Sequence, residues 1–333
     1  MCYLSAQAKA NGDWIRSTPA LHVDENGDGL LFVAGIRDVL IALDAATGEE
    51  RWRVDFAARA GMDPEAFGHV ASPLALSDET GDAAVYVHTV AGFSKVDAAA
   101  GEALWTVLDR TVGADGESMM TEGAFSSPVA ATIGGVPQIL VQTRTRLYGV
   151  NPADGFGLWH TDVEAFRGMN ILTPVVLPLR GETGGGARLL TSTYGGGTTL
   201  REVKRTDGLW VVSTEWENNR QGYMSSPVVI DGYVYQHLKN DRLVCYDLET
   251  GEAAWTGPPG PDYRSLVTDG ARILSLGSGG ELELIAADPT EFRLLDERAV
   301  TDATSWAHVA VTGNGEGGRI FVRALDALIA YEF

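Results

Sequence analysis

The chain has 333 residues, of which 45% are hydrophobic and 40 are glycine. This length exceeds what one compact core usually fills, so it predicts two domains, one large barrel or a ring of repeats. The apolar fraction excludes a wholly disordered chain. The formal net charge of −20 excludes nucleic acid from the expected partners, because so acidic a surface repels phosphate backbones.

One sequence phrase recurs along the chain: an apolar strand, an Asp, a turn that ends in Gly, and a Trp a few residues later. It is clearest in Leu43–Trp52 and returns almost unchanged in Tyr246–Trp255. Weaker copies end at Trp105, Trp159 and Trp210, and a degenerate sixth copy lacks the Trp. A Ser/Thr-Pro pair followed by an apolar strand precedes each of the first five copies. Four short strands in every ~40–50 residues are the pattern of a β-propeller blade.

We therefore predict an all-β chain, with one β-propeller domain of four-stranded antiparallel blades over residues 1–333. The seven visible units span about 17–56, 71–110, 126–163, 172–219, 225–258, 265–298 and 308–333. The last unit ends after its third strand. Residues 1–16 are therefore expected either to supply the closing outer strand or to follow an eighth blade in a longer parent chain.

The repeated turn and strand residues are expected to be structural. The turn glycines are Gly48, Gly101, Gly155 and Gly251, and the outer-strand tryptophans are Trp52, Trp105, Trp159 and Trp255. Glycine suits these turns because they need a positive φ. Each Trp is expected to dock between neighbouring blades and to donate its indole N–H to a partner.

The two cysteines predict no disulfide framework, and Cys245, which sits in an apolar strand, is expected to be a small buried residue. No apolar run reaches the roughly 18 residues that a membrane helix needs. We therefore expect no transmembrane segment, and no secretory signal peptide is visible at the start of this chain.

The phrase Leu43–Trp52, read as Leu-Asp-x-x-Thr-Gly-Glu-x-x-Trp, resembles the hallmark of the PQQ-like (quinoprotein-type) propeller repeat. Within that family the chain looks most like the BamB-like, non-enzymatic bacterial propellers. The resemblance implies a protein-interaction or ligand-binding scaffold that works outside the cytoplasm, in the periplasm or at the cell surface. The alternatives are a PQQ-dependent alcohol or sugar dehydrogenase, a carbohydrate-active propeller, or the sensor half of a larger signalling protein.

The residues argue against the dehydrogenase alternative. Those enzymes carry a vicinal Cys-Cys pair and a bound Ca²⁺, and this sequence has no Cys-Cys. A hard cation needs about six clustered oxygen ligands. Asp24–Gly29 resembles a Ca²⁺ loop, but Gly35 stands where the glutamate at the twelfth loop position belongs. We interpret the segment as a hairpin turn and expect no PQQ, no metal ion and no catalytic residue.

Polar and aromatic residues gather in two kinds of loop: those that lead into an innermost strand, and the turns between second and third strands. The candidate binding residues are Arg37, His69, Arg144, Arg167, Asn170, Tyr194, Tyr223, Lys239, Trp306, His308 and Arg323. If these side chains converge, they form a cationic, aromatic-lined mouth that suits a protein or peptide partner, above all an acidic one, or a glycan. The alternative is a set of scattered, solvated loop residues.

Overall fold

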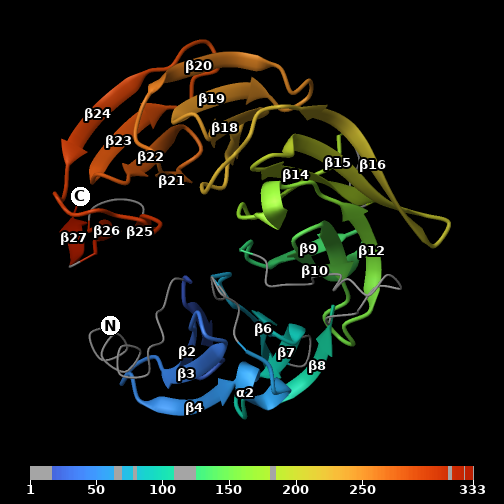
Figure 1. Ribbon diagram of the computed structural model, residues 1–333. Coiled ribbons are helices and arrows are strands. Elements are labelled where there is room, and N and C mark those ends of the chain that lie inside the picture. Colours follow the sequence, from blue (N-terminus) through green and yellow to red (C-terminus); the bar gives the residue numbers. More distant parts are fainter. Residues whose placement is uncertain are drawn as a thin grey trace. The chain divides into compact units, whose positions relative to one another are not determined.

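The computed structural model describes residues 17–63, 70–77, 81–108, 125–180, 185–313, 317–325 and 327–332. Within them the chain is all-β, with six antiparallel sheets of four strands and a seventh of three (Figure 1). In every sheet the strands lie side by side in the order of the sequence. The predicted fold class, a seven-bladed β-propeller of antiparallel blades, is confirmed. Residues 1–16, considered above as a closing strand, lie outside the described residues.

The first three sheets contain β1 (Ala20–Val23), β2 (Gly29–Ala34), β3 (Val39–Asp44), β4 (Glu50–Asp55); β5 (Leu74–Ser77), β6 (Ala83–Thr89), β7 (Gly92–Asp97), β8 (Ala103–Val107); β9 (Val129–Ile133), β10 (Val136–Gln142), β11 (Arg146–Val150) and β12 (Gly157–Asp162). The next two contain β13 (Val175–Leu177), β14 (Gly186–Thr193), β15 (Gly197–Thr206), β16 (Leu209–Asn218); β17 (Val228–Ile230), β18 (Tyr233–His237), β19 (Arg242–Asp247) and β20 (Ala253–Pro259). The last two contain β21 (Arg264–Thr268), β22 (Arg272–Gly277), β23 (Glu281–Ala286), β24 (Leu294–Ala299); β25 (Ala310–Thr312), β26 (Arg319–Arg323) and β27 (Leu328–Glu332).

Two short helical segments interrupt the described strands, α2 (Phe56–Ala60) and the 3-10 turn η1 (Phe166–Gly168). No helix among the described residues has the length and apolar character needed to cross a membrane. The chain divides into two compact units, which we call unit 1 (1–189 with 201–213) and unit 2 (190–200 with 214–333). The division passes through the fourth sheet.

In each unit the apolar core lies between neighbouring sheets, because alternate residues of a strand point to opposite faces. In unit 1, Phe32 and Leu40 of the first sheet pack with Val85 of the second. In unit 2, Cys245 of the fifth sheet packs with Ile273 of the sixth. Cys245 is a free, buried cysteine, as its apolar strand predicts. Full burial of apolar side chains of this kind contributes roughly 1.5–3 kcal/mol each.

The outer-strand tryptophans of the first two sheets join each sheet to the next one in unit 1. A Cβ placed on Gly101 would lie 2.8 Å from the Trp52 ring, and on Gly155 3.1 Å from the Trp105 ring. The Trp52 indole also donates to the carbonyl oxygen of Ala98 at 2.9 Å. The turn glycines therefore serve two purposes: they take a positive φ, and they leave room for the Trp of the preceding sheet.

The fourth sheet departs from the expected spacing. The residue that docks on the fifth sheet is Trp216, whose indole donates to the carbonyl oxygen of Leu248 at 2.8 Å. A Cβ on Gly251 would lie 2.7 Å from the Trp216 ring. Trp210, the end of the weak fourth copy, instead has the Arg205 guanidinium 5.8 Å from its ring centre. The sequence assignment of Trp210 to the repeated position was wrong, because β15 and β16 are both 10 residues long.

Trp159 differs from the other tryptophans as well. Its indole donates at 2.7 Å to Gln138 in its own sheet rather than to a neighbouring sheet. Trp255 follows the expected pattern in unit 2, where its indole donates to the carbonyl oxygen of Asp288 in the sixth sheet at 2.8 Å. The indole N–H therefore bonds to the following sheet at Trp52, Trp216 and Trp255. At Trp159 the hydrogen bond stays within the third sheet, while the ring packs with Ala187 and Leu189 of the fourth.

The Asp of the repeated phrase organises its own turn. Asp44 Oδ1 accepts the Thr47 amide at 2.8 Å, and Asp44 Oδ2 accepts from Arg51 at 2.6 Å. These bonds to Thr47 and Arg51 lower the pKa of Asp44 to about 2. Asp97 and Asp247 accept the amides of the two residues that open their turns in the same way. A carboxylate used in this way stabilises the hairpin.

The Ser/Thr-Pro pairs link successive innermost strands in unit 1. The Thr18 amide donates to Ser72 Oγ at 2.9 Å, and the Ser72 amide donates to Ser127 Oγ at 3.0 Å. Each serine hydroxyl oxygen thus accepts a backbone N–H from the preceding sheet. The proline that follows each Ser or Thr has no N–H, so it adds no backbone donor that needs a partner.

Candidate functional site: the ends of the sheets that carry cations and aromatic rings

The expected binding residues lie at one end of each sheet, in the turn between its second and third strands and in the loop that leads into the next sheet. In unit 1 these are Arg37, Arg144, Arg167 and Asn170, and in unit 2 they are Tyr194, Tyr223, Lys239, Trp306, His308 and Arg323. His69 lies outside the described residues. Arg37 is exposed in the β2–β3 turn.

In unit 1 Asn170 is a positioning residue and is not displayed to a partner. Its side chain is fully buried, and Nδ2 donates to the carbonyl oxygens of Thr143 at 2.8 Å and Arg144 at 2.9 Å. A Cβ on Gly168 would lie 2.7 Å from the Arg144 side chain. The loop before β13 is therefore held tightly against the β10–β11 turn.

This clamped loop displays Phe166 and Arg167. Phe166 is 46% exposed, and the Arg167 guanidinium lies 5.2 Å from the centre of its ring. Arg167 has a φ of 53°, a left-handed conformation that costs a residue with a Cβ roughly 1–2 kcal/mol. Three residues after Arg167, the bonds from Asn170 tie the chain to the β10–β11 turn. The sequence named Arg167 but missed Phe166, although the two are adjacent.

In unit 2 three of the expected residues do come together. Lys239 Nζ donates to the Tyr194 hydroxyl at 2.9 Å and lies 4.1 Å from the centre of the Tyr194 ring. Tyr223 meets Tyr194 edge-on, with 5.7 Å between ring centres. The ammonium group is thus held over an aromatic face by a cation–π contact, while Lys239 as a whole stays exposed.

A buried polar network supports this cluster from within the sheets. Gln236 donates to Ser192 Oγ at 2.5 Å, and the Tyr246 hydroxyl donates to Gln236 at 2.7 Å. The Gly222 amide donates to Ser192 Oγ at 2.9 Å, and Thr198 Oγ1 lies 2.6 Å from the same oxygen. Burial raises the pKa of Tyr246 far above its usual value, so this hydroxyl stays a donor. The network fixes the loop that carries Tyr223.

The remaining candidates of unit 2 surround a second aromatic pair. Trp306 is 51% exposed and stacks on Tyr263, with 5.6 Å between ring centres and 15° between planes. Ser305 Oγ donates to the Arg323 carbonyl at 2.9 Å, which ties the Trp306 loop to the end of β26. His308 and Arg323 are exposed. One face of the Trp306 indole is therefore covered by the Tyr263 ring.

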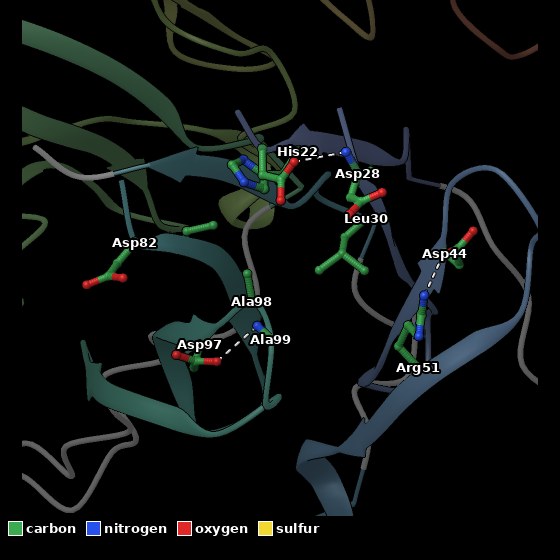
Figure 2. A pocket seen from close by; sticks show the side chains of 12 residues that line it. His22, Asp28, Leu30, Asp44, Arg51, Asp82, Asp97, Ala98 and Ala99 are labelled. Atoms are coloured by element: carbon green, nitrogen blue, oxygen red, sulfur yellow. Dashed lines mark hydrogen bonds and ion pairs between the residues drawn. The ribbon is translucent and has the colours of Figure 1, made fainter. Parts of the chain in front are cut away.

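The opposite end of the first two sheets carries a different chemistry. A cavity of about 390 Å³ in unit 1 is lined by five aspartates together with His22 and Arg51 (Figure 2). Figure 2 shows Asp44 turned toward Arg51 and Asp97 turned toward the amide of Ala99. These carboxylates hold hairpin turns together.

The Ca²⁺-like loop Asp24–Gly29 lines the same cavity. Asp24 Oδ1 accepts the amides of Asn26 and Asp28, each at 2.9 Å, as in a hairpin turn. Across the described parts of the chain, no three His, Cys, Asp or Glu side chains lie close enough to hold a metal ion. That the protein holds no Ca²⁺ ion and takes no PQQ stays a prediction.

Antiparallel sheets of this type, joined by Trp–Gly contacts and Asp-capped turns, define a propeller built from PQQ-like repeats. The family described as "Outer membrane protein assembly factor BamB" matches residues 14–257. That stretch is more than half of the chain, and the chain belongs to this family. The expected resemblance to BamB-like propellers is confirmed.

A curated relative named "Outer membrane protein assembly factor BamB", from Moranella endobia (strain PCIT), is 26% identical over 250 residues. The match covers 72% of this chain and 58% of the relative, so the chain spans 58% of that relative's length.

Two solved structures share the fold. "The crystal structure of BamB from Moraxella catarrhalis" has a TM-score of 0.66 at 19% identity, and the match covers 96% of this chain and 86% of that one. "Structure of U3-55K" has a TM-score of 0.51 at 11% identity, covering 93% and 88%. At such low identity these likenesses show the fold alone.

Proposed function

We propose that this protein is a non-catalytic scaffold that binds a protein partner during outer-membrane protein assembly, outside the cytoplasm. Membership of the family described as an outer-membrane protein assembly factor supports this setting. The partner is expected to dock on the unit 1 loop that displays Phe166 and Arg167. The bound protein, its location and the absence of a PQQ cofactor are all parts of this proposal.

The observation that carries the proposal is the way Phe166 and Arg167 are held. A half-exposed phenyl ring beside an exposed guanidinium, on a backbone of positive φ, is costly to the folded chain. The fully buried Asn170 and the close contact between Gly168 and Arg144 keep it in place. Aromatic residues and arginine dominate the binding energy of many protein interfaces. A partner with an apolar pocket rimmed by carboxylates fits this loop.

A photo-crosslinking residue at position 166 tests the docking site in living cells. We expect one strong crosslink to a protein of the outer-membrane assembly machinery, and its loss when Arg167→Glu is added. A matched control is the same residue at position 209, since Leu209 is also in unit 1 and is 71% exposed. Equal crosslinking at the two positions, or none at position 166, contradicts the proposed site.

The non-catalytic part of the proposal needs a separate test. The purified protein is incubated with PQQ and Ca²⁺, and then absorbance of bound cofactor and reduction of a dye with alcohols and sugars are measured. We expect no stoichiometric binding and no dye reduction. Binding of one PQQ per chain would overturn the scaffold interpretation even if the crosslinks are found.

A further inference from the structure

A groove in unit 2 has no part in the docking loop described above. Its volume is about 460 Å³, and it is lined by Asn219, Arg220, Gln221, Leu238, Lys239 and Asn240. Both charged residues in this lining are cations, in a chain whose net charge is −20. The local field therefore favours an anionic ligand.

The two walls of the groove are fixed to one another. The Lys239 amide donates to the Gln221 carbonyl at 2.9 Å, and Gly222 pairs with Leu238 as an isolated β-bridge. The Gln221 side chain accepts the Gly195 amide at 3.3 Å. The groove is thus built on backbone contacts between the loop before β17 and the β18–β19 turn, and a ligand need not order either segment.

The two cations are oriented before any ligand arrives. Lys239 Nζ has one bond, to the Tyr194 hydroxyl, of the three it can donate. Arg220 donates one N–H to the Gly251 carbonyl at 2.9 Å, and its guanidinium lies 5.9 Å from the centre of the Tyr246 ring. Both groups therefore keep N–H donors for a ligand. Their contacts with the protein already limit their motion, so a ligand has less side-chain freedom to remove than it would with unrestrained long side chains.

We propose that this groove binds the carboxylates of an acidic peptide segment from a partner protein. The ammonium group and the guanidinium supply charge-assisted hydrogen bonds, which are the strong ones for carboxylates. The side-chain amides of Asn219 and Asn240 also line the groove, and an amide N–H can donate to the same carboxylates. Tyr223, edge-on to Tyr194, offers an apolar surface to the next residue of such a segment. The proposal goes beyond the docking loop and does not depend on it.

The test measures fluorescence anisotropy of two labelled peptides, one that alternates Glu with Tyr and one that alternates Gln with Tyr. We expect saturable binding of the Glu peptide only, weakened at least tenfold by Lys239→Gln and by a rise from 50 to 300 mM NaCl. Lys239→Arg should keep most of the affinity. Arg298→Gln is the matched control, since it removes one positive charge from unit 2 at an exposed residue of β24 that does not line the groove.

Three results would overturn the inference: equal binding of the Gln peptide, unchanged affinity in Lys239→Gln with unchanged thermal melting, or full displacement of the Glu peptide by a few millimolar inorganic phosphate. The last result would mean a general anion site rather than a carboxylate site. Arg167→Glu should leave peptide binding unaltered. Failure of the groove is therefore distinguishable from failure of the docking loop.

Discussion

The two ends of β19 carry polar groups with different roles: at one end they stabilise a turn, and at the other they are exposed to solvent. At the last residue of the strand, Asp247 Oδ1 accepts the amides of Glu249 and Thr250, each at 2.8 Å. Before the strand, the β18–β19 turn sends Lys239 outward onto the Tyr194 ring. At the first end the Asp247 carboxylate accepts hydrogen bonds from its own turn. At the second end the Lys239 ammonium group lies over the Tyr194 ring and keeps N–H donors for a ligand. We call these the capped end and the display end.

The comparison gives a rule for this fold. The repeated Asp four residues before a turn glycine stabilises the hairpin, and its carboxylate has little left to offer a ligand. Cations at the display end are supported by rings and by buried polar groups in the strands beneath them. Substitutions at the capped end should therefore lower stability, and those at the display end should lower binding.

The largest expected effect is at a capped end that also receives a tryptophan. Gly101→Ala places a Cβ 2.8 Å from the Trp52 ring at a φ of 71°, so it combines overpacking with backbone strain. We expect a loss of about 2–4 kcal/mol in the free energy of unfolding. Urea denaturation measures it.

Gly48→Ala is the matched control for this substitution. Gly48 occupies the same turn position at a φ of 75°, but nothing lies within 4 Å of its Cβ position. Only the strain of a positive φ remains there, about 1–2 kcal/mol. Equal losses at the two glycines would show that the Trp contact does not matter to stability.

The second effect concerns His237, the buried residue beneath the display turn of β18–β19. Burial and the nearby Arg264 lower the pKa of His237 to about 4, and Nε2 lies 3.1 Å from the Pro261 carbonyl. The unfolded chain takes up a proton near the ordinary histidine pKa of 6.5, whereas the folded chain resists it. The free energy of unfolding therefore keeps its full value above pH 6.5. It falls as the pH drops toward 4, by up to about 1.4 kcal/mol per pH unit.

His237→Gln should flatten this part of the pH profile, because glutamine keeps a donor for Pro261 and does not titrate. Thermal melting between pH 7 and pH 4 measures the change. His160→Gln is the control, since His160 is exposed on β12 and its replacement should leave the slope as it is. An unchanged slope in His237→Gln would assign the acid sensitivity to other groups.

A smaller loss is expected when the Asp of a capped end is removed. Asp247→Ala takes away the acceptor of the Glu249 and Thr250 amides, and we expect a loss of about 1–2 kcal/mol. Asp247→Asn keeps one acceptor oxygen and should cost less than half of that. Chemical denaturation of the two variants gives the comparison. A larger loss for Asn than for Ala would contradict the role of the carboxylate oxygen as acceptor.

Much of the fold could be predicted from the sequence, because its signals are local. The Leu43–Trp52 phrase contains a strand, a turn and the outer-strand Trp within ten consecutive residues. The fourth sheet escaped the prediction because the outer strand there is longer, so Trp216 and not Trp210 reaches the next sheet. No spacing rule detects a lengthened hairpin when two tryptophans stand on one strand.

The display end was harder to predict because its geometry comes from contacts between distant segments. Asn170 looked like an exposed loop residue, but its amide bonds to carbonyl groups 26 and 27 residues away. Arg220 lies in a loop that the sequence singled out, but it is absent from the candidate residues because its role as a groove wall depends on the β18–β19 turn across from it. The positive φ of Arg167 has no sequence signal, since that residue is not a glycine.

Arg167→Gly has the smallest expected effect on stability, and its sign is the opposite of the others. Glycine takes a positive φ without strain, so the variant should be more stable by about 0.5–1 kcal/mol. It should also lose the crosslink from position 166, because the guanidinium is gone. Denaturation and crosslinking of the same variant measure both effects.

Arg37→Gly is the control: Arg37 has no positive φ, so glycine there should lower stability. A stabilised Arg167→Gly that keeps full partner binding would mean that the strained backbone is not maintained for docking, and the distinction between the two ends would fail in unit 1.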